Sequence, residues 1–174
     1  PAHVAASSGQ TICLRLLLAA GCDKNAKDRD RCTPAHYAAK KGNVGCLELL
    51  LAKGCEIDAV GGTGFTPAHD AARTGHVYCL ELLLEAGCKI DERNSANRTP
   101  LHEAIISNHS SHKCLRLLIL AGANTASKRS IFHFGSQAWH RSTLEVKHFS
   151  KRFADSPTKN ESWRLIACRP NITR

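Results

Sequence analysis

The sequence lacks methionine, is poor in aromatic residues and contains no long apolar run. Aromatic residues make up 5% of the 174 residues, so a core must be built mainly from leucine, alanine, isoleucine and cysteine. Because a membrane-spanning helix needs roughly 20 apolar residues in a row, we expect no membrane span. The first ten residues also lack the basic start and apolar stretch of a signal peptide.

The chain opens at Pro1 instead of a methionine, so we expect it to be a piece of a longer protein. Its net charge is +9, and this charge is unevenly distributed. Residues 1–129 hold 16 basic and 12 acidic residues, whereas residues 130–174 hold 8 and 3. A basic balance of this kind weakly favours acidic partners or nucleic acid.

Several residue types recur at one interval of 33 residues, which indicates an internal repeat. The recurring residues are Pro1, Pro34, Pro67 and Pro100; His3, His36, His69 and His102; Cys13, Cys46 and Cys79; and Gly21, Gly54 and Gly87. In the fourth copy the cysteine and glycine are Cys114 and Gly122, two residues later than this interval predicts. The two extra residues fall in the polar stretch 108–113, which we expect to be a loop.

Each copy has the pattern of two short helices. Thr33 is a good helix N-cap, and Pro34 is tolerated at the first helical position. Gly42 can adopt the left-handed conformation that ends this first helix. The apolar residues of Cys46–Leu51 then lie at helical spacing on one side of a second helix, which ends at Gly54.

These copies resemble the ankyrin repeat. The resemblance covers residues 1–129 and rests on Thr33-Pro34-Ala35-His36-Tyr37-Ala38-Ala39, Thr66-Pro67-Ala68-His69-Asp70-Ala71-Ala72 and Thr99-Pro100-Leu101-His102-Glu103-Ala104. It implies an all-α solenoid of stacked helix-turn-helix pairs with β-hairpin fingers, in about four repeats of which the first is incomplete. Arg31 and Asn97 stand where the family usually has a hairpin glycine, whereas Gly64 fits the pattern.

The first copy lacks its opening hairpin, and each repeat buries its apolar face only against its neighbours. We therefore expect Val4, Ile12 and Leu16 to be poorly covered. This again favours further repeats upstream of Pro1.

The recurring histidines and cysteines favour a structural interpretation over a metal site. In ankyrin repeats the histidine forms local hydrogen bonds that tie the hairpin to its helix. Neighbouring copies should lie about 8–10 Å apart, too far for shared zinc ligands. We expect reduced thiols in an intracellular protein, with four in the buried position of the second helices: Cys13, Cys46, Cys79 and Cys114.

Two irregular motifs also receive structural interpretations. His109, His112 and Cys114 lack the fourth ligand of a structural zinc site, and Cys114 should point inward. The run Gly61-Gly62-Thr63-Gly64 lacks the ending of a phosphate-binding loop, so a hairpin turn is favoured. With no other catalytic motif in the chain, we expect no enzyme, no metal and no cofactor.

The resemblance implies a protein partner that binds the hairpin tips and the exposed side of the first helices, which together form a concave face. Tyr37 and Phe65 are aromatic residues of the kind that anchors interfaces. The remaining candidates make the face basic with acidic interruptions, and they are Arg29, Asp30, Lys40, Lys41, Asp70, Arg73, Arg98 and Glu103. We therefore expect an acidic or mixed-charge partner with an apolar anchor. The alternative is a solvated face, with the partner site on repeats outside this chain.

The repeat stops at Ser130, and residues 130–174 form a basic tail. Ser142-Thr143-Leu144-Glu145 fits a capping box, which predicts a short helix over residues 143–153. We expect the rest of the tail to be disordered, or to be a gene-model artefact. A degradation-adaptor box is rejected, because Arg164 stands where such a box has leucine and Pro170 interrupts the expected helix. Contact of the tail with nucleic acid or a membrane surface stays a further alternative.

The sequence as a whole therefore predicts a non-catalytic protein-binding module of a scaffold or adaptor, acting in the cytoplasm or alternatively in the nucleus. A second hypothesis is the ankyrin portion of a larger enzyme, channel or ubiquitin-ligase adaptor. A third is charge-driven contact with nucleic acid through the basic tail, although we expect nucleic acid to be the less favoured partner.

Overall fold

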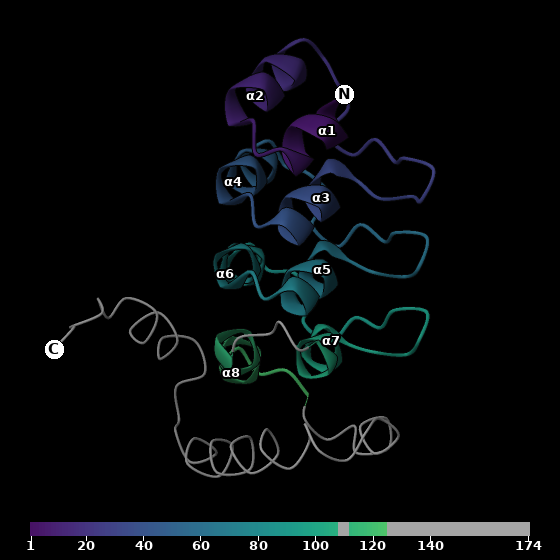
Figure 1. Ribbon diagram of the computed structural model, residues 1–174, viewed down its shortest axis with the longest axis vertical. Helices are drawn as coiled ribbons and strands as arrows, with labels where there is room; N and C mark the ends of the chain where they lie inside the picture. The colour runs from purple at the N-terminus through teal and green to yellow at the C-terminus, as the bar shows by residue number, and fades with distance from the viewer. Residues whose placement is uncertain (108–111, 125–174) are drawn as a thin grey trace, which may run out of the picture.

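The computed structural model describes residues 1–107 and 112–124, and this part of the chain holds eight α-helices in four consecutive pairs (Figure 1). The pairs are α1 (Ala2–Ser7) with α2 (Thr11–Ala19), α3 (Pro34–Lys41) with α4 (Val44–Ala52), α5 (Pro67–Thr74) with α6 (Val77–Glu85), and α7 (Pro100–Ile106) with α8 (His112–Leu120). The predicted tail helix at 143–153 lies outside the described residues. So do residues 108–111, which form most of the stretch that carries the two extra residues.

The helices form two layers that run the length of the stack (Figure 1). The first helices α1, α3, α5 and α7 pack side by side, and the second helices α2, α4, α6 and α8 form the other layer. The long connections between pairs project away from the second helices as three loops, which we call finger 1 (residues 28–32), finger 2 (residues 61–65) and finger 3 (residues 94–98). The predicted all-α repeat solenoid is confirmed.

The predicted start and end signals define the first helices. Thr33 is the N-cap of α3 in an extended conformation, and Pro34 follows it in the first turn. Gly42 ends α3 with a φ of 74°, and Gly75 ends α5 with a φ of 79°. In contrast, α7 ends at Ser107 in an extended conformation. α7 therefore ends without the left-handed glycine that ends α3 and α5.

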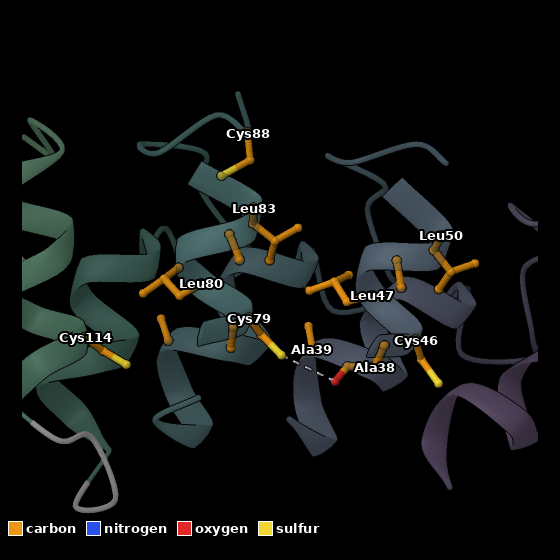
Figure 2. Close-up of a cluster of buried hydrophobic side chains, with 14 of the residues drawn as sticks. Ala38, Ala39, Cys46, Leu47, Leu50, Cys79, Leu80, Leu83, Cys88 and Cys114 are labelled. Atoms are coloured by element: carbon orange, nitrogen blue, oxygen red, sulfur yellow. Dashed lines mark hydrogen bonds between the residues drawn. The ribbon is translucent and has the colours of Figure 1, made fainter. Parts of the chain in front are cut away.

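A thin layer of alanine lets the helices approach closely (Figure 2). Ala38 and Ala39 of α3 are fully buried, as are Leu47 and Leu50 of α4. The Cys79 Sγ–H points at the Ala38 carbonyl oxygen of the preceding repeat, 4.0 Å away. Small side chains at these positions keep the packing dense although the chain has few aromatic residues.

Three of the four cysteines predicted to be buried in the second helices are indeed buried, namely Cys46, Cys79 and Cys114. Burial raises the pKa of the Cys79 and Cys114 thiols to about 11. The prediction for Cys13 is wrong, because its side chain is exposed. The equivalent cysteines are covered by the first helix of the preceding repeat, and no described helix precedes α1.

The end of the stack at α1 and α2 is an uncovered apolar surface, as predicted. Val4 is 68% exposed, Ile12 is 74% exposed and Leu16 is 65% exposed. The stacking principle explains both this exposure and that of Cys13, because each repeat depends on its neighbour for burial.

Each finger is a tight turn with two internal backbone hydrogen bonds, one of which closes its base. In finger 1 the Asp28 N–H donates to the Cys32 carbonyl over 3.0 Å, and equivalent bonds close fingers 2 and 3. None of the described residues is in a β-strand, so the expected β-hairpins are turns without strands. Five residues are too few for a longer ladder. The turns depend on a left-handed residue, with φ of 59° at Arg31, 76° at Gly64 and 59° at Asn97.

We expect Arg31→Gly to stabilise the protein by about 0.5–1 kcal/mol. The left-handed conformation costs a side-chain-bearing residue about 1–2 kcal/mol, and the entropy of an added glycine offsets part of that gain. The Arg31 side chain is exposed and makes no hydrogen bond or ion pair with the described residues. Urea denaturation followed by circular dichroism measures the change.

Arg29→Gly is the matched control, because Arg29 lies in the same finger without a positive φ. It should lower the urea midpoint, since glycine there adds only unfolded-state entropy. If Arg31→Gly lowers the midpoint as much as Arg29→Gly does, the left-handed conformation of Arg31 costs nothing and the explanation is wrong.

Candidate functional site

A buried histidine ties each finger to the first helix of the preceding repeat. The Thr33 N–H donates to His36 Nδ1 over 3.1 Å. Because a backbone N–H can only donate, Nδ1 is the acceptor and Nε2 carries the ring proton. Nε2 then donates to the Phe65 carbonyl in finger 2, 2.9 Å away. The predicted structural role of this histidine is confirmed.

The same arrangement recurs along the stack. His69 accepts the Thr66 N–H over 3.2 Å and donates to the Arg98 carbonyl in finger 3 over 2.9 Å. Burial lowers the pKa of both His36 and His69, so both rings are neutral at pH 7. At the first repeat, His3 Nε2 lies 3.0 Å from the Cys32 carbonyl in finger 1. We call this series of contacts the histidine ladder.

The three fingers are also linked to one another near their tips. The Gly62 N–H donates to the Asp30 carbonyl over 2.7 Å, and the Ser95 N–H donates to the Thr63 carbonyl over 3.2 Å. A Cβ at Gly62 would lie 2.9 Å from the Asp30 carbonyl oxygen, so glycine is what permits this approach. The fingers and the adjacent sides of the first helices therefore form one connected surface, which we call the finger face.

Four of the predicted partner-binding residues have exposed side chains on the finger face. They are Arg29 and Asp30 on finger 1, and Lys40 and Lys41 in the last turn of α3. Within the described part of the chain, Arg29, Lys40 and Lys41 form no ion pair. The C-terminal end of a helix carries a partial negative charge, which holds the two lysines there favourably.

Asp70 and Glu103 differ from the expectation that they face a partner. Asp70 is 5% exposed and Glu103 is 3% exposed. Arg73 Nη2 lies 3.3 Å from Asp70 Oδ1, and Arg98 Nε lies 3.4 Å from Glu103 Oε1. Burial raises the pKa of Asp70, and the positive charges of Arg73 and Lys40 partly offset this effect. The two carboxylates lie beneath the exposed surface, and each forms an ion pair with one arginine of the finger face.

Tyr37 also has a second role that sequence reasoning missed. Its hydroxyl donates to Asp28 Oδ2 over 2.6 Å, while Asp28 Oδ1 accepts the N–H groups of Asp30 and Cys32. This bond raises the pKa of Tyr37 to about 12 and lowers the pKa of Asp28. Tyr37 thus braces finger 1 against α3, and its ring stands edge-on to His3.

Finger 3 has an equivalent brace, and finger 2 does not. Asn94 Oδ1 accepts two finger N–H groups, and Asn94 Nδ2 donates to Glu103 Oε1 over 2.8 Å. In both braced fingers, Asp28 and Asn94 precede the helix residue by nine positions. The corresponding residue nine positions before Asp70 is Gly61, so Asp70 has no side-chain partner in finger 2. This nine-residue spacing is the signal that could have predicted the burial of Glu103.

Phe65 is held in place by side chains of α5. The Arg73 guanidinium lies 4.8 Å from the centre of the Phe65 ring, and the His69 ring lies 5.4 Å from it in a tilted arrangement. Phe65 and Tyr37 are both half-buried, so each ring offers part of its surface to a partner. The structure therefore brings together both aromatic rings, the exposed cations and Arg73 on the finger face.

Within the described residues, no group of three or more His, Cys, Asp or Glu side chains is arranged to hold a metal ion. His109 lies outside this part of the chain, and Cys114 is buried as expected. No helix among residues 1–107 and 112–124 is both long and apolar enough to cross a bilayer.

The comparison with protein families identifies the class of this protein. The family model described as ankyrin repeats (3 copies) matches residues 2–94 and 61–130, so the chain belongs to the ankyrin repeat family. Ankyrin repeats generally act as protein–protein interaction modules, and the family is typically non-catalytic. None of the curated proteins matches the chain.

We expect the free energy of unfolding to fall as the pH drops below 6.5. Burial lowers the pKa of His36 and His69 from their usual value of 6.5, so the unfolded chain binds protons that the folded chain does not. Their stabilising contribution is complete above pH 6.5 and is lost on acidification. Asp70 acts in the opposite direction at pH values above its usual pKa of 3.8, because its raised pKa lets the folded chain take up a proton first.

Urea midpoints at pH 7.5 and pH 5.5 measure this dependence. The variant His36→Gln/His69→Gln should be less stable at pH 7.5 but should lose most of the difference between the two pH values. An unchanged midpoint for the natural sequence at pH 5.5 would contradict the neutral, buried state of the two rings.

Proposed function

We propose that this chain is a non-catalytic binding module of a scaffold or adaptor, and that a protein partner binds its finger face. The observation that carries the proposal is the group of exposed cations Arg29, Lys40 and Lys41, which form no ion pair with the described residues, beside the half-buried rings of Tyr37 and Phe65. Aromatic and arginine side chains dominate the energetics of protein interfaces, and cations steer association.

The histidine ladder supports this proposal because it fixes the fingers before a partner arrives. A surface that is already ordered loses little conformational entropy on binding, so more of the contact energy appears as affinity. The finger backbones are held by the histidines from one side, by neighbouring fingers from the other, and by Asp28 and Asn94 from within.

The ten candidate residues divide into three roles in this proposal. Arg29, Asp30, Lys40 and Lys41 contact the partner directly through exposed side chains. Tyr37, Phe65, Arg73 and Arg98 are half-buried and contribute partial surfaces. Asp70 and Glu103 act from beneath, where each holds an arginine in position.

The other hypotheses from the sequence stay predictions. An enzyme, channel or ligase-adaptor context would depend on sequence beyond this chain, and nucleic-acid contact would depend on the basic tail, which lies outside the described residues. No observation on residues 1–107 or 112–124 favours either of them. The cytoplasmic setting stays a prediction as well.

We expect Lys40→Ala/Lys41→Ala to weaken partner binding by about tenfold or more without unfolding the protein. Both side chains are exposed and form no ion pair with the described residues, so their removal takes away partner contacts and, within the protein, only the weak attraction between Lys40 and the buried Asp70. A quantitative pull-down from nuclease-treated lysate, with the full chain as bait, measures the loss.

The matched control is Arg15→Ala/Lys53→Ala, which removes the same charge from α2 and from the residue that follows α4, in the second-helix layer. A protein retained by the natural chain and by the control but lost by the lysine variant supports the finger face as the site. Equal retention by both variants would contradict the proposal.

A further inference from the structure

We infer that the partner, if it binds the finger face as proposed, presents an extended acidic segment in which a carboxylate lies about two residues from an apolar side chain. The carboxylate contacts Lys40 and Lys41, and the apolar side chain contacts Phe65. This inference rests on the proposed function and narrows it to one class of ligand and one register.

The burial of Asp70 and Glu103 decides between an acidic and a mixed-charge partner. The sequence places acidic residues among the basic ones along the first helices. This pattern alone favours neither an acidic nor a mixed-charge partner. In the structure each of these two carboxylates is buried and contacts one arginine, Arg73 or Arg98. Their negative charges are therefore compensated within the protein, and the two arginines are engaged in turn.

The charge that remains for a partner is concentrated at one end of the finger face. Arg29, Arg31, Lys40 and Lys41 are exposed and form no ion pair among the described residues, and Asp28 and Asp30 oppose them there. All six lie on finger 1 and α3, so the cations remain in excess. Carboxylates of a partner are thus attracted to the end of α3, whereas the α5 and α7 part of the face is close to neutral.

The Phe65 backbone lies about one helical turn away from the Lys40 backbone. The Phe65 carbonyl accepts the proton of His36 Nε2, so the Phe65 backbone lies beside His36 on α3. Lys40 is four residues further along α3, which is about 6 Å at the rise of an α-helix. An extended chain rises about 3.3 Å per residue, so about two residues span this distance. Side chains two positions apart point to the same side of an extended chain, and both contacts can form together.

A polypeptide fits this surface better than a nucleic-acid strand does. A strand of nucleic acid carries a regular series of phosphates and needs a continuous track of available cations. Here the cations of α5 and finger 3, Arg73 and Arg98, already contact buried carboxylates, and the exposed Asp30 repels phosphate. One cationic end beside one fixed aromatic ring favours a short segment with both charge and apolar character.

The experiment that tests this inference selects a random 12-residue peptide library on phage against the full chain. We expect the enriched sequences to share Asp or Glu two positions from an aromatic or aliphatic residue. The best peptide is then synthesised with a fluorescent label, and its affinity is measured by anisotropy. Replacement of its Asp and Glu by Asn and Gln should weaken binding at least tenfold.

Charge-reversed variants of the protein locate the contact. Lys40→Glu/Lys41→Glu should weaken binding of the acidic peptide more than tenfold, whereas Arg15→Glu/Lys53→Glu, with the same change in net charge, should leave it nearly unchanged. Phe65→Ala should weaken binding as well, and Phe65→Leu should restore part of the affinity. Thermal melts of all variants confirm that each is folded.

The outcomes separate the two proposals. Enriched peptides that are neutral or basic, and whose binding depends on Phe65, would overturn the acidic segment and leave the finger face as the site. Peptides whose binding is unaffected by the Lys40, Lys41 and Phe65 variants, or a library that yields no enriched sequence, would count against both. A scrambled peptide or a single-stranded DNA of equal charge that binds equally well would reduce the effect to general polyanion attraction and would overturn the inference.

Discussion

The hydrogen bond from a buried histidine to the next finger is the interaction on which the rest of this structure depends. His36 and His69 each accept a backbone N–H at the start of their own helix and donate to a carbonyl one repeat further on. Each ring thereby caps a helix, fixes a finger and couples two repeats at once. Because both ring nitrogens are used, the ring must be neutral and in one tautomer, which makes the repeat-to-repeat coupling dependent on pH.

The residues that follow His36, His69 and His102 determine which charges of the finger face are used within the protein. Tyr37 and Glu103 both form a hydrogen bond with an Asp or Asn nine positions earlier and brace their fingers, whereas Asp70 has Gly61 at the corresponding position and contacts Arg73 instead. Arg73 in turn lies over Phe65. The acidic side chains are thereby used internally, and the cations at the end of α3 are left for a partner. The bracing of the fingers and the ligand preference that we propose both follow from this one position in each repeat.

The repeating elements of the fold could be predicted from the sequence, because the 33-residue recurrence of Pro, His and Cys reports packing that is the same in each copy. Most positions that vary between copies could not. The nine-residue spacing between Asn94 and Glu103 could have predicted the burial of Glu103, but Asp70 has a glycine at the corresponding position, and the exposure of Cys13 depends on whether a helix covers it. Single-residue patterns carry no information on such neighbours. In the sequence, Arg31 and Asn97 are recognisable only as residues that replace the usual hairpin glycine. Their left-handed conformation is seen in the structure.

The claim that a partner binds the finger face is tested most directly by hydrogen–deuterium exchange, read by mass spectrometry. The exchange of the chain is compared with and without a protein partner recovered in the pull-down. The account predicts slower exchange in fingers 1 and 2 and at the end of α3, with little change in α2, α4 and α6. Protection confined to the second helices, or to the uncovered surface of α1 and α2, would contradict the finger face as the binding site.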